Sequence, residues 1–149
     1  MNLHLIPTLL LRPYRVHSAG PCSIPLLQRV PAGFPSPADD YVEKRLDINE
    51  HLVRHPAATF LFDVTGDSMI LAGILDGDKV VVDRSIEPAD RHIVVALVRG
   101  ERTLKRLFRR GTRVELRPEN PAYKPIVFND GDDLEIWGVV VGVVRRYPC

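Results

Sequence analysis

The sequence predicts a mostly β domain whose sheet is strongly coiled or closed, preceded by an extended N-terminal arm. Short runs rich in β-branched and aromatic residues recur from Thr59 onward, and glycine-containing turn signals separate them. Prolines are unevenly distributed, since seven of the 13 lie within residues 1–37. Proline is excluded from helix interiors and central strands, so we expect residues 1–37 to form the arm and residues 38–149 the folded domain.

Six segments of the domain have the apolar pattern of strands. They are Thr59–Val64, Lys79–Asp83, Ile93–Val98, Thr103–Phe108, Arg113–Arg117 and Leu134–Arg145. Arg99-Gly100-Glu101 and Arg110-Gly111-Thr112 have the residues of hairpin turns between the middle strands. Gly138 and Gly142 fall inside the last segment, where glycine indicates the bends that a coiled or partly closed sheet requires.

One short helix is expected near the start of the domain. Asp47-Ile48-Asn49-Glu50 resembles a capping box in which aspartate replaces serine or threonine, so a helix should run from there to Arg54. Pro56 would end this helix. The proline-rich arm has no room for a helix-turn-helix, so no direct sequence-specific DNA binding is expected.

The composition is that of an ordinary globular protein, with 45% hydrophobic and 26% charged residues and a formal net charge of +1. Two cysteines, Cys22 and Cys149, do not make a disulfide framework, which favours a reducing, cytoplasmic setting. The apolar stretches at 3–11 and 137–144 are too short to span a bilayer, so no membrane association is expected.

No cofactor and no metal site is expected from the sequence. His51 and His55 are four residues apart and could share one helix face, but two histidines without a third ligand favour polar surface over metal binding. Asp76 and Asp78 have the pattern of turn-forming residues.

A serine and a lysine form the candidate catalytic pair. Gly66-Asp67-Ser68-Met69 follows a predicted strand, and a serine in such a tight turn can present its hydroxyl. Lys105, on the predicted strand Thr103–Phe108, shares a strand face with Thr103 and Leu107. Burial lowers the pKa of a lysine, and a neutral amine can take the proton of a serine hydroxyl. The two residues therefore suggest a Ser-Lys dyad.

Each residue of the pair also has a purely structural interpretation. A lone Gly-x-Ser usually marks a turn, and Lys105 lies in a basic run between Arg99 and Arg117, where solvated charges are common. That run could face nucleic acid or a protein partner, or it could simply keep edge strands soluble. Other serine chemistries fit worse, because the chain has no Ser-x-x-Lys and no Gly-x-Ser-x-Gly.

Several motifs, in their order and spacing, carry a family resemblance. They are Thr65-Gly66-Asp67-Ser68-Met69, Asp76-Gly77-Asp78-Lys79-Val80-Val81-Val82-Asp83, Lys105-Arg106-Leu107, Asn120-Pro121-Ala122-Tyr123-Lys124-Pro125-Ile126 and Gly138-Val139-Val140. From about Pro25 to Arg146 the chain resembles the LexA/UmuD family of self-cleaving serine peptidases (peptidase family S24). The UmuD branch is the more similar, because the segment from Gly33 to Glu43 resembles the start of the processed UmuD fragment.

The resemblance implies a LexA/UmuD-like coiled sheet and assigns roles to particular residues. Ser68 would be the nucleophile and Lys105 the general base, while backbone N–H groups of Asp67 and Ser68 would stabilise the oxyanion. The scissile bond would be Ala32-Gly33, where a small residue precedes a glycine in an extended segment. A plain linker of similar composition is the alternative interpretation of that segment.

The resemblance also implies partners, which nothing in the composition indicates. A RecA filament on single-stranded DNA would stimulate self-cleavage during the SOS response to DNA damage. The shortened product would form a homodimer and join a UmuC-type DNA polymerase subunit in error-prone translesion synthesis. Two alternatives stay open. One is a non-catalytic interaction module that regulates a polymerase or a repressor. The other is a peptidase that cuts other proteins as signal peptidases do, which the lack of a membrane anchor before the serine disfavours.

Overall fold

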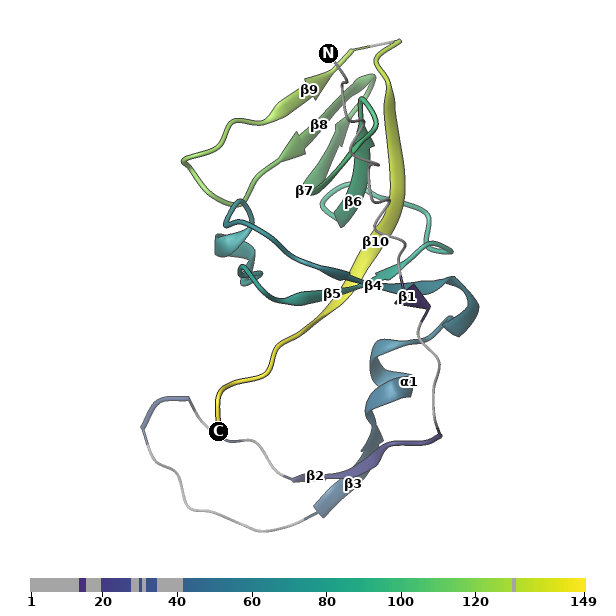
Figure 1. The fold of residues 1–149 in the computed structure, drawn as a ribbon, viewed down its shortest axis with the longest axis vertical. Coiled ribbons are helices and arrows are strands. Elements are labelled where there is room, and N and C mark those ends of the chain that lie inside the picture. The colour runs from purple at the N-terminus through teal and green to yellow at the C-terminus, as the bar shows by residue number, and fades with distance from the viewer. Residues whose placement is uncertain (1–13, 16–19, 28–29, 31, 35–41, 130) are drawn as a thin grey trace, which may run out of the picture.

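An eight-stranded antiparallel sheet forms the body of the molecule, with the strand order β1-β4-β5-β10-β6-β7-β8-β9 (Figure 1). The structure is a computed structural model that describes residues 14–15, 20–27, 30, 32–34, 42–129 and 131–149. The strands are β1 (Tyr14–Arg15), β4 (Thr59–Asp63), β5 (Lys79–Asp83), β6 (Ile93–Val98), β7 (Glu101–Arg110), β8 (Arg113–Arg117), β9 (Ile126–Phe128) and β10 (Leu134–Val144).

All six predicted segments are strands in the structure, and β5, β6 and β8 have the predicted bounds. β7 starts two residues earlier than predicted, because Arg99 and Gly100 alone make the turn between β6 and β7. Both residues have positive φ, 51° and 81°, as two-residue hairpin turns require. The predicted set lacks β9, because three residues are too few to show an alternating pattern.

The sheet is strongly coiled, as predicted, but it does not close into a barrel. The register of β10 shifts between Ile136 and Gly138 against β6, and between Val140 and Gly142 against β5. These irregularities coincide with the two glycines at which the sequence predicted bends. The edge strands β1 and β9 are only two and three residues long and do not pair with each other, so the sheet stays open within the described residues.

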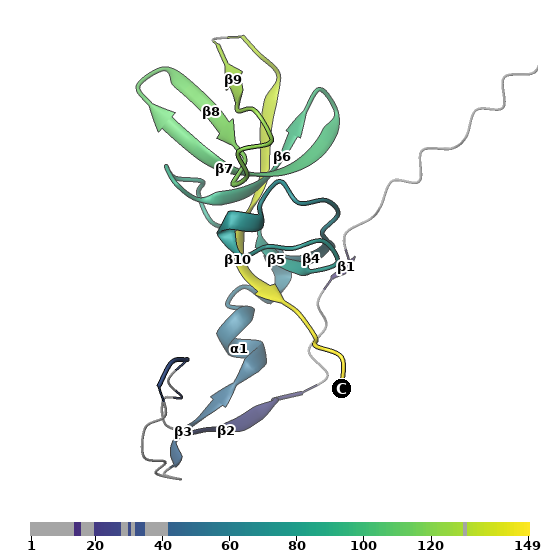
Figure 2. The same cartoon turned by 90° about the vertical axis from the view of Figure 1, so that its left-hand side faces the viewer.

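A separate two-stranded sheet lies between β1 and β4 in the chain. β2 (Ser23–Leu27) pairs antiparallel with β3 (Val42–Asp47), and the helices α1 (Ile48–Leu52) and η1 (Pro56–Ala58) connect β3 to β4. Figures 1 and 2 both show this hairpin beyond α1, at the opposite end of the molecule from β7 and β8. The hairpin therefore projects away from the large sheet.

The predicted helix cap is confirmed. The Asp47 carboxylate accepts hydrogen bonds from the backbone nitrogens of Asn49 (2.8 Å) and Glu50 (3.2 Å), which satisfies two donors at the start of α1. The helix ends at Leu52, two residues before the predicted end at Arg54.

The proline-rich arm is described only in part. Residues 1–13, 16–19, 28–29, 31 and 35–37 lie outside the described residues, so the prediction of an extended arm there stays a prediction. The described remainder contains the short edge strand β1 and the strand β2, whose partner β3 lies beyond the predicted boundary at residue 37. Neither strand is central in the large sheet, as the prolines predicted.

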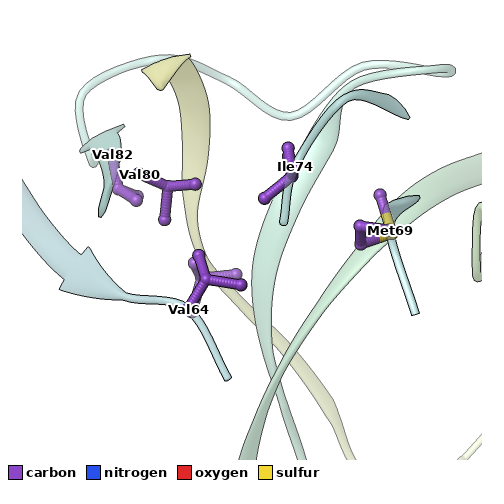
Figure 3. Close-up of a cluster of buried hydrophobic side chains, with 6 residues drawn as sticks. Val64, Met69, Ile74, Val80 and Val82 are labelled. Carbon is purple, nitrogen blue, oxygen red and sulfur yellow. The ribbon is translucent and has the colours of Figure 1, made fainter. Parts of the chain in front are cut away.

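Two clusters of buried apolar side chains form the core. The first consists of Val64, Met69, Ile74, Val80, Val82 and Val95 (Figure 3), and the second of Val94, Ala96, Leu107, Leu116, Phe128 and Val139. Val94 and Val95 are neighbours on β6, so their side chains point to opposite faces and reach different clusters. The first cluster holds the backbone next to Ser68 in place, because the buried Met69 directly follows that serine in the chain.

Candidate active site

Ser68 lies in a tight turn after β4, which we call the serine turn (residues 65–69). Gly66 has a φ of 87°, a conformation that glycine adopts at no steric cost, and its backbone nitrogen donates to Asp76 Oδ1 at 2.6 Å. Met69 is only 2% exposed and packs in the first core cluster. The turn is therefore held at both ends, and Ser68 between them is half-buried.

Lys105 reaches the serine from the middle of β7, where it pairs with Val94 of β6. Its Nζ lies 3.0 Å from Ser68 Oγ, 2.9 Å from Thr103 Oγ1 and 2.9 Å from the carbonyl oxygen of Leu104. The predicted sharing of one strand face by Lys105 and Thr103 is consistent with this contact. Burial of the amine lowers the pKa of Lys105 below its ordinary value of 10.5, because a desolvated ammonium is disfavoured.

The serine and the lysine line one small cavity of about 210 Å³. Its wall is mostly apolar on the side of the first core cluster, and polar groups line the rest. The lining residues are Phe62, Asp63, Val64, Thr65, Gly66, Ser68, Met69, Val80, Val95, Arg102, Thr103, Leu104 and Lys105. A cavity of this size accommodates a short segment with small side chains next to the serine hydroxyl.

A loop that the sequence did not assign to the site packs against the serine turn. We call it the 118–123 loop. The backbone nitrogen of Glu119 donates to the Ser68 carbonyl (2.8 Å), Asn120 Nδ2 donates to the Asp67 carbonyl (3.0 Å), and the Tyr123 hydroxyl donates to Asp67 Oδ1 (2.5 Å). These partners are more than 50 residues apart in the chain. The Asn-Pro-Ala-Tyr motif was the only available signal, and on its own it indicates a turn.

The proposed scissile residues are not at the site in this conformation. Ala32 and Gly33 are exposed in a bend, and neither lines the cavity next to Ser68. A Cβ added at Gly33 would meet nothing within 4 Å. The predicted oxyanion donors, the amides of Asp67 and Ser68, make no hydrogen bond to another residue within the described part of the chain.

Other singled-out residues have structural partners. His55 Nδ1 lies 2.6 Å from Oδ2 of the buried Asp83, so this exposed histidine is tied to β5. The predicted turn former Asp78 is also buried, and Arg145 binds both of its carboxylate oxygens at 2.6 Å. Cys22 and Cys149 are free and exposed. Within the described ranges no His, Cys, Asp and Glu side chains gather into a possible metal site, and no helix there has the length and apolar character needed to cross a bilayer.

The family model described as peptidase S24-like matches residues 25–141, which include both the serine turn and β7. The chain belongs to the peptidase S24-like family. The predicted resemblance to LexA/UmuD-like members of this family is thereby confirmed.

Three curated relatives illustrate what this S24 chain is similar to. The chain is 45% identical to Protein MucA of Escherichia coli over 137 residues, which cover 90% of this chain and 89% of MucA. It is 45% identical to Protein SamA of Salmonella typhimurium over 119 residues, 80% of this chain and 82% of SamA. It is also 40% identical to the LexA repressor of Clostridium perfringens over 124 residues, which are 83% of this chain but 60% of the repressor.

These matches support a peptidase of the self-cleaving, SOS-response type. MucA and SamA are matched over most of their length, whereas about two fifths of the LexA repressor have no counterpart in the match.

Proposed function

We propose that this S24 peptidase is a cytoplasmic serine peptidase that cuts its own Ala32-Gly33 bond with a Ser68/Lys105 dyad. The observation that carries the proposal is the distance of 3.0 Å between Lys105 Nζ and Ser68 Oγ at the wall of a small cavity that is lined on one side by the first core cluster. This distance suits direct proton transfer between a nucleophile and its base. The lowered pKa of Lys105 makes the neutral amine available nearer to physiological pH.

The contacts of Lys105 match the hydrogen-bonding capacity of a neutral amine. An uncharged amine has two N–H donors and one lone pair. In the structure Nζ donates to Ser68 Oγ, Thr103 Oγ1 and the Leu104 carbonyl oxygen. When the amine is neutral, its two N–H donors can serve Thr103 Oγ1 and the Leu104 carbonyl, which leaves the lone pair to accept the Ser68 hydroxyl proton. In this form Lys105 is both oriented and basic.

The reaction proceeds in two stages. Ser68 Oγ attacks the carbonyl carbon of Ala32, and its proton passes to Lys105 Nζ, while backbone amides of the serine turn stabilise the oxyanion. The C–N bond then breaks as Lys105 returns the proton to the Gly33 nitrogen. Water, deprotonated by Lys105, hydrolyses the ester, so that residues 1–32 leave and Ser68 is restored.

The Ala32-Gly33 bond must be brought to Ser68 before this chemistry can start, because the bend at residues 32–34 lies outside the cavity. A RecA filament on single-stranded DNA is the proposed stimulus. The processed form would act as a homodimer with a UmuC-type subunit of an error-prone DNA polymerase. The similarity to MucA, SamA and LexA supports this part of the proposal.

Mass spectrometry of the fragments tests the proposal directly. The purified chain is incubated at alkaline pH, and separately with RecA on single-stranded DNA and ATP. We expect fragments 1–32 and 33–149 from the wild type, none from Ser68→Ala or Lys105→Ala, and normal cleavage in Lys79→Ala, which removes an exposed lysine. Intact wild-type chain under both conditions, or cleavage that survives Ser68→Ala, would show that the chain is not such a peptidase. Unchanged damage tolerance with Ser68→Ala in cells would favour the non-catalytic interaction module.

A further inference from the structure

The peptide bond between Asp67 and Ser68 has a fixed orientation. In a trans peptide the C=O and N–H groups point in opposite directions, and none of the described peptide bonds is cis. The Asp67 carbonyl accepts two hydrogen bonds, one from Asn120 Nδ2 of the 118–123 loop at 3.0 Å and one from the Ile70 nitrogen of its own turn at 3.2 Å. The Ser68 N–H must therefore point away from this loop.

Ser68, Met69 and Lys105 line the catalytic cavity, and no residue of the 118–123 loop does. We therefore infer that the Ser68 N–H, which points away from the loop, points toward the cavity. The Ser68 N–H makes no hydrogen bond to any residue that the structure describes. This amide is thus available to an oxygen atom bound in the cavity, which is the requirement for an oxyanion donor.

Two side chains of the loop hold the Asp67 residue. Asn120 Oδ1 accepts from the Ala122 nitrogen at 3.0 Å, which fixes the orientation of the amide so that Nδ2 faces Asp67. Tyr123 binds the Asp67 carboxylate, and this carboxylate raises the pKa of the Tyr123 hydroxyl. The hydroxyl therefore keeps its proton in alkaline solution, where more Lys105 is neutral.

The same loop is tied to the strand that carries the base. Glu119 forms an ion pair with Arg106, the residue after Lys105 on β7, and Arg106 also donates to the Arg91 carbonyl at 2.8 Å. The backbone of Glu119 binds both Ser68 and Leu71 of the serine side. The 118–123 loop thus contacts both the turn that carries the proposed nucleophile and the strand that carries its proposed base.

We propose that Asn120 and Tyr123 are positioning residues for self-cleavage, which hold Asp67 so that the Ser68 N–H stays aimed at the carbonyl oxygen of the scissile bond. The inference rests on the proposed function and adds two residues to its machinery. Neither residue touches the reacting atoms. Both act through Asp67, and their loss should lower the rate of the chemical step without changing the base.

The test measures first-order self-cleavage of the full chain across alkaline pH for Tyr123→Phe and Asn120→Ala. We expect a rate about tenfold lower for each, because small displacements of a catalytic group cost up to ~10²-fold. The pH midpoint, which reports Lys105, and the thermal unfolding midpoint should stay unchanged. Tyr147→Phe is the matched control, because it removes an exposed hydroxyl that contacts Arg145 and not the serine turn, and it should cleave at the wild-type rate.

Two further measurements separate positioning from a general structural role. Asp67→Ala and the double variant Asp67→Ala/Tyr123→Phe should show the same reduction in cleavage rate. Both variants lack the hydrogen bond between Tyr123 and Asp67, so the second substitution should add nothing. A peptide boronic acid ending in boro-alanine forms a tetrahedral adduct with Ser68 that places an oxygen in the oxyanion position. Its affinity should fall in Tyr123→Phe and Asn120→Ala by a factor similar to that of the rate.

Each contrary outcome has a distinct meaning. Wild-type rates in both variants, beside an inactive Ser68→Ala, would overturn the positioning role and leave the proposed function intact. A lower rate that is matched by a lower folded fraction, or a shifted pH midpoint, would also overturn it. A wild-type chain that stays intact at every pH would overturn both.

Discussion

The amine of Lys105 and the hydroxyl of Ser68 lie 3.0 Å apart although 37 residues separate them in the chain. The serine comes from a turn held by the apolar core, and the lysine comes from a strand between two others in the sheet. Neither element can move toward or away from the other without disturbing the core. The pair is therefore preorganised before any substrate segment arrives.

Replacing Lys105 by arginine separates its charge from its basicity. Arginine keeps a positive charge at this position but stays protonated at any accessible pH, so it cannot act as a base. We expect Lys105→Arg to lower the self-cleavage rate at least about 10³-fold while the protein remains folded. Lys79→Arg is the control. Measurable cleavage by Lys105→Arg would contradict a role for Lys105 as the general base.

The self-cleavage rate should rise with pH. Only the neutral amine of Lys105 is a base, so below its pKa the rate should increase about tenfold per pH unit and then level off. Burial lowers this pKa, so the plateau should begin below the ordinary lysine value of 10.5. First-order rate constants from gels or mass spectra, over the pH range in which circular dichroism is constant, check this. A pH-independent rate would argue against the dyad.

Asp78 should contribute to stability in a pH-dependent way. Its hydrogen bonds with Arg145, together with one from the Leu75 nitrogen, lower the pKa of Asp78 from 3.8 to about 2. The folded pKa lies below the unfolded value, so the unfolded chain binds the proton more tightly. Stability from this group is present above about pH 4 and is lost as the pH falls toward about 2.

We expect this loss to be about 1–2 kcal/mol, because the Arg145 side chain is 30% exposed and water screens part of the interaction. Urea unfolding of the wild type and Asp78→Asn between about pH 2 and about pH 7 measures it. The variant should be less stable at neutral pH and should show a shallower acid dependence. Asp63→Asn, which removes an exposed ion pair with Lys79, should keep the wild-type dependence. Identical curves for Asp78→Asn and wild type would refute the assignment.

The two glycines of β10 should differ in their tolerance of alanine. A Cβ at Gly138 would lie 2.7 Å from Val82 Cγ1 and 3.2 Å from the Asp83 carbonyl oxygen, in a region of the core with no free space. A Cβ at Gly142 would lie 3.0 Å from the end of the Leu52 side chain, which can rotate. Chemical denaturation should give a loss of about 1–3 kcal/mol for Gly138→Ala and under about 1 kcal/mol for Gly142→Ala. A larger loss of stability for Gly142→Ala than for Gly138→Ala would contradict the surroundings described for these two glycines.

Local sequence patterns predicted most of the large sheet but only part of the site. Alternation, turn residues and the Asp47 cap are properties of a few consecutive residues, so β4–β8, β10 and α1 could be predicted. The pairing of β2 with β3 could not, since Pro25 lies in β2 and nothing local indicates a partner strand. Family resemblance selected Ser68 and Lys105 among five serines and four lysines, and the folded sheet brings the two side chains together.

The remaining parts of the site depend on contacts between distant segments. Tyr123 and Asp67 are 56 residues apart, and Arg145 and Asp78 are 67 apart. Each of these residues also occurs in ordinary turns or on ordinary surfaces, so no local pattern marks it. Only the folded sheet shows which carboxylate each one binds.

The bend at residues 32–34 belongs to a hairpin that projects from the body, whereas Ser68, the proposed nucleophile, lies in the body. A chain with this layout can accumulate uncut without an inhibitor, because the proposed scissile bond lies away from Ser68. Under the proposed self-cleavage each molecule is cut once, at its own bond, so the amount of product is set by the number of molecules made. The half-life then distinguishes the two routes by which the bond can reach a serine: it is independent of dilution for rearrangement within one chain and lengthens on dilution for exchange between copies.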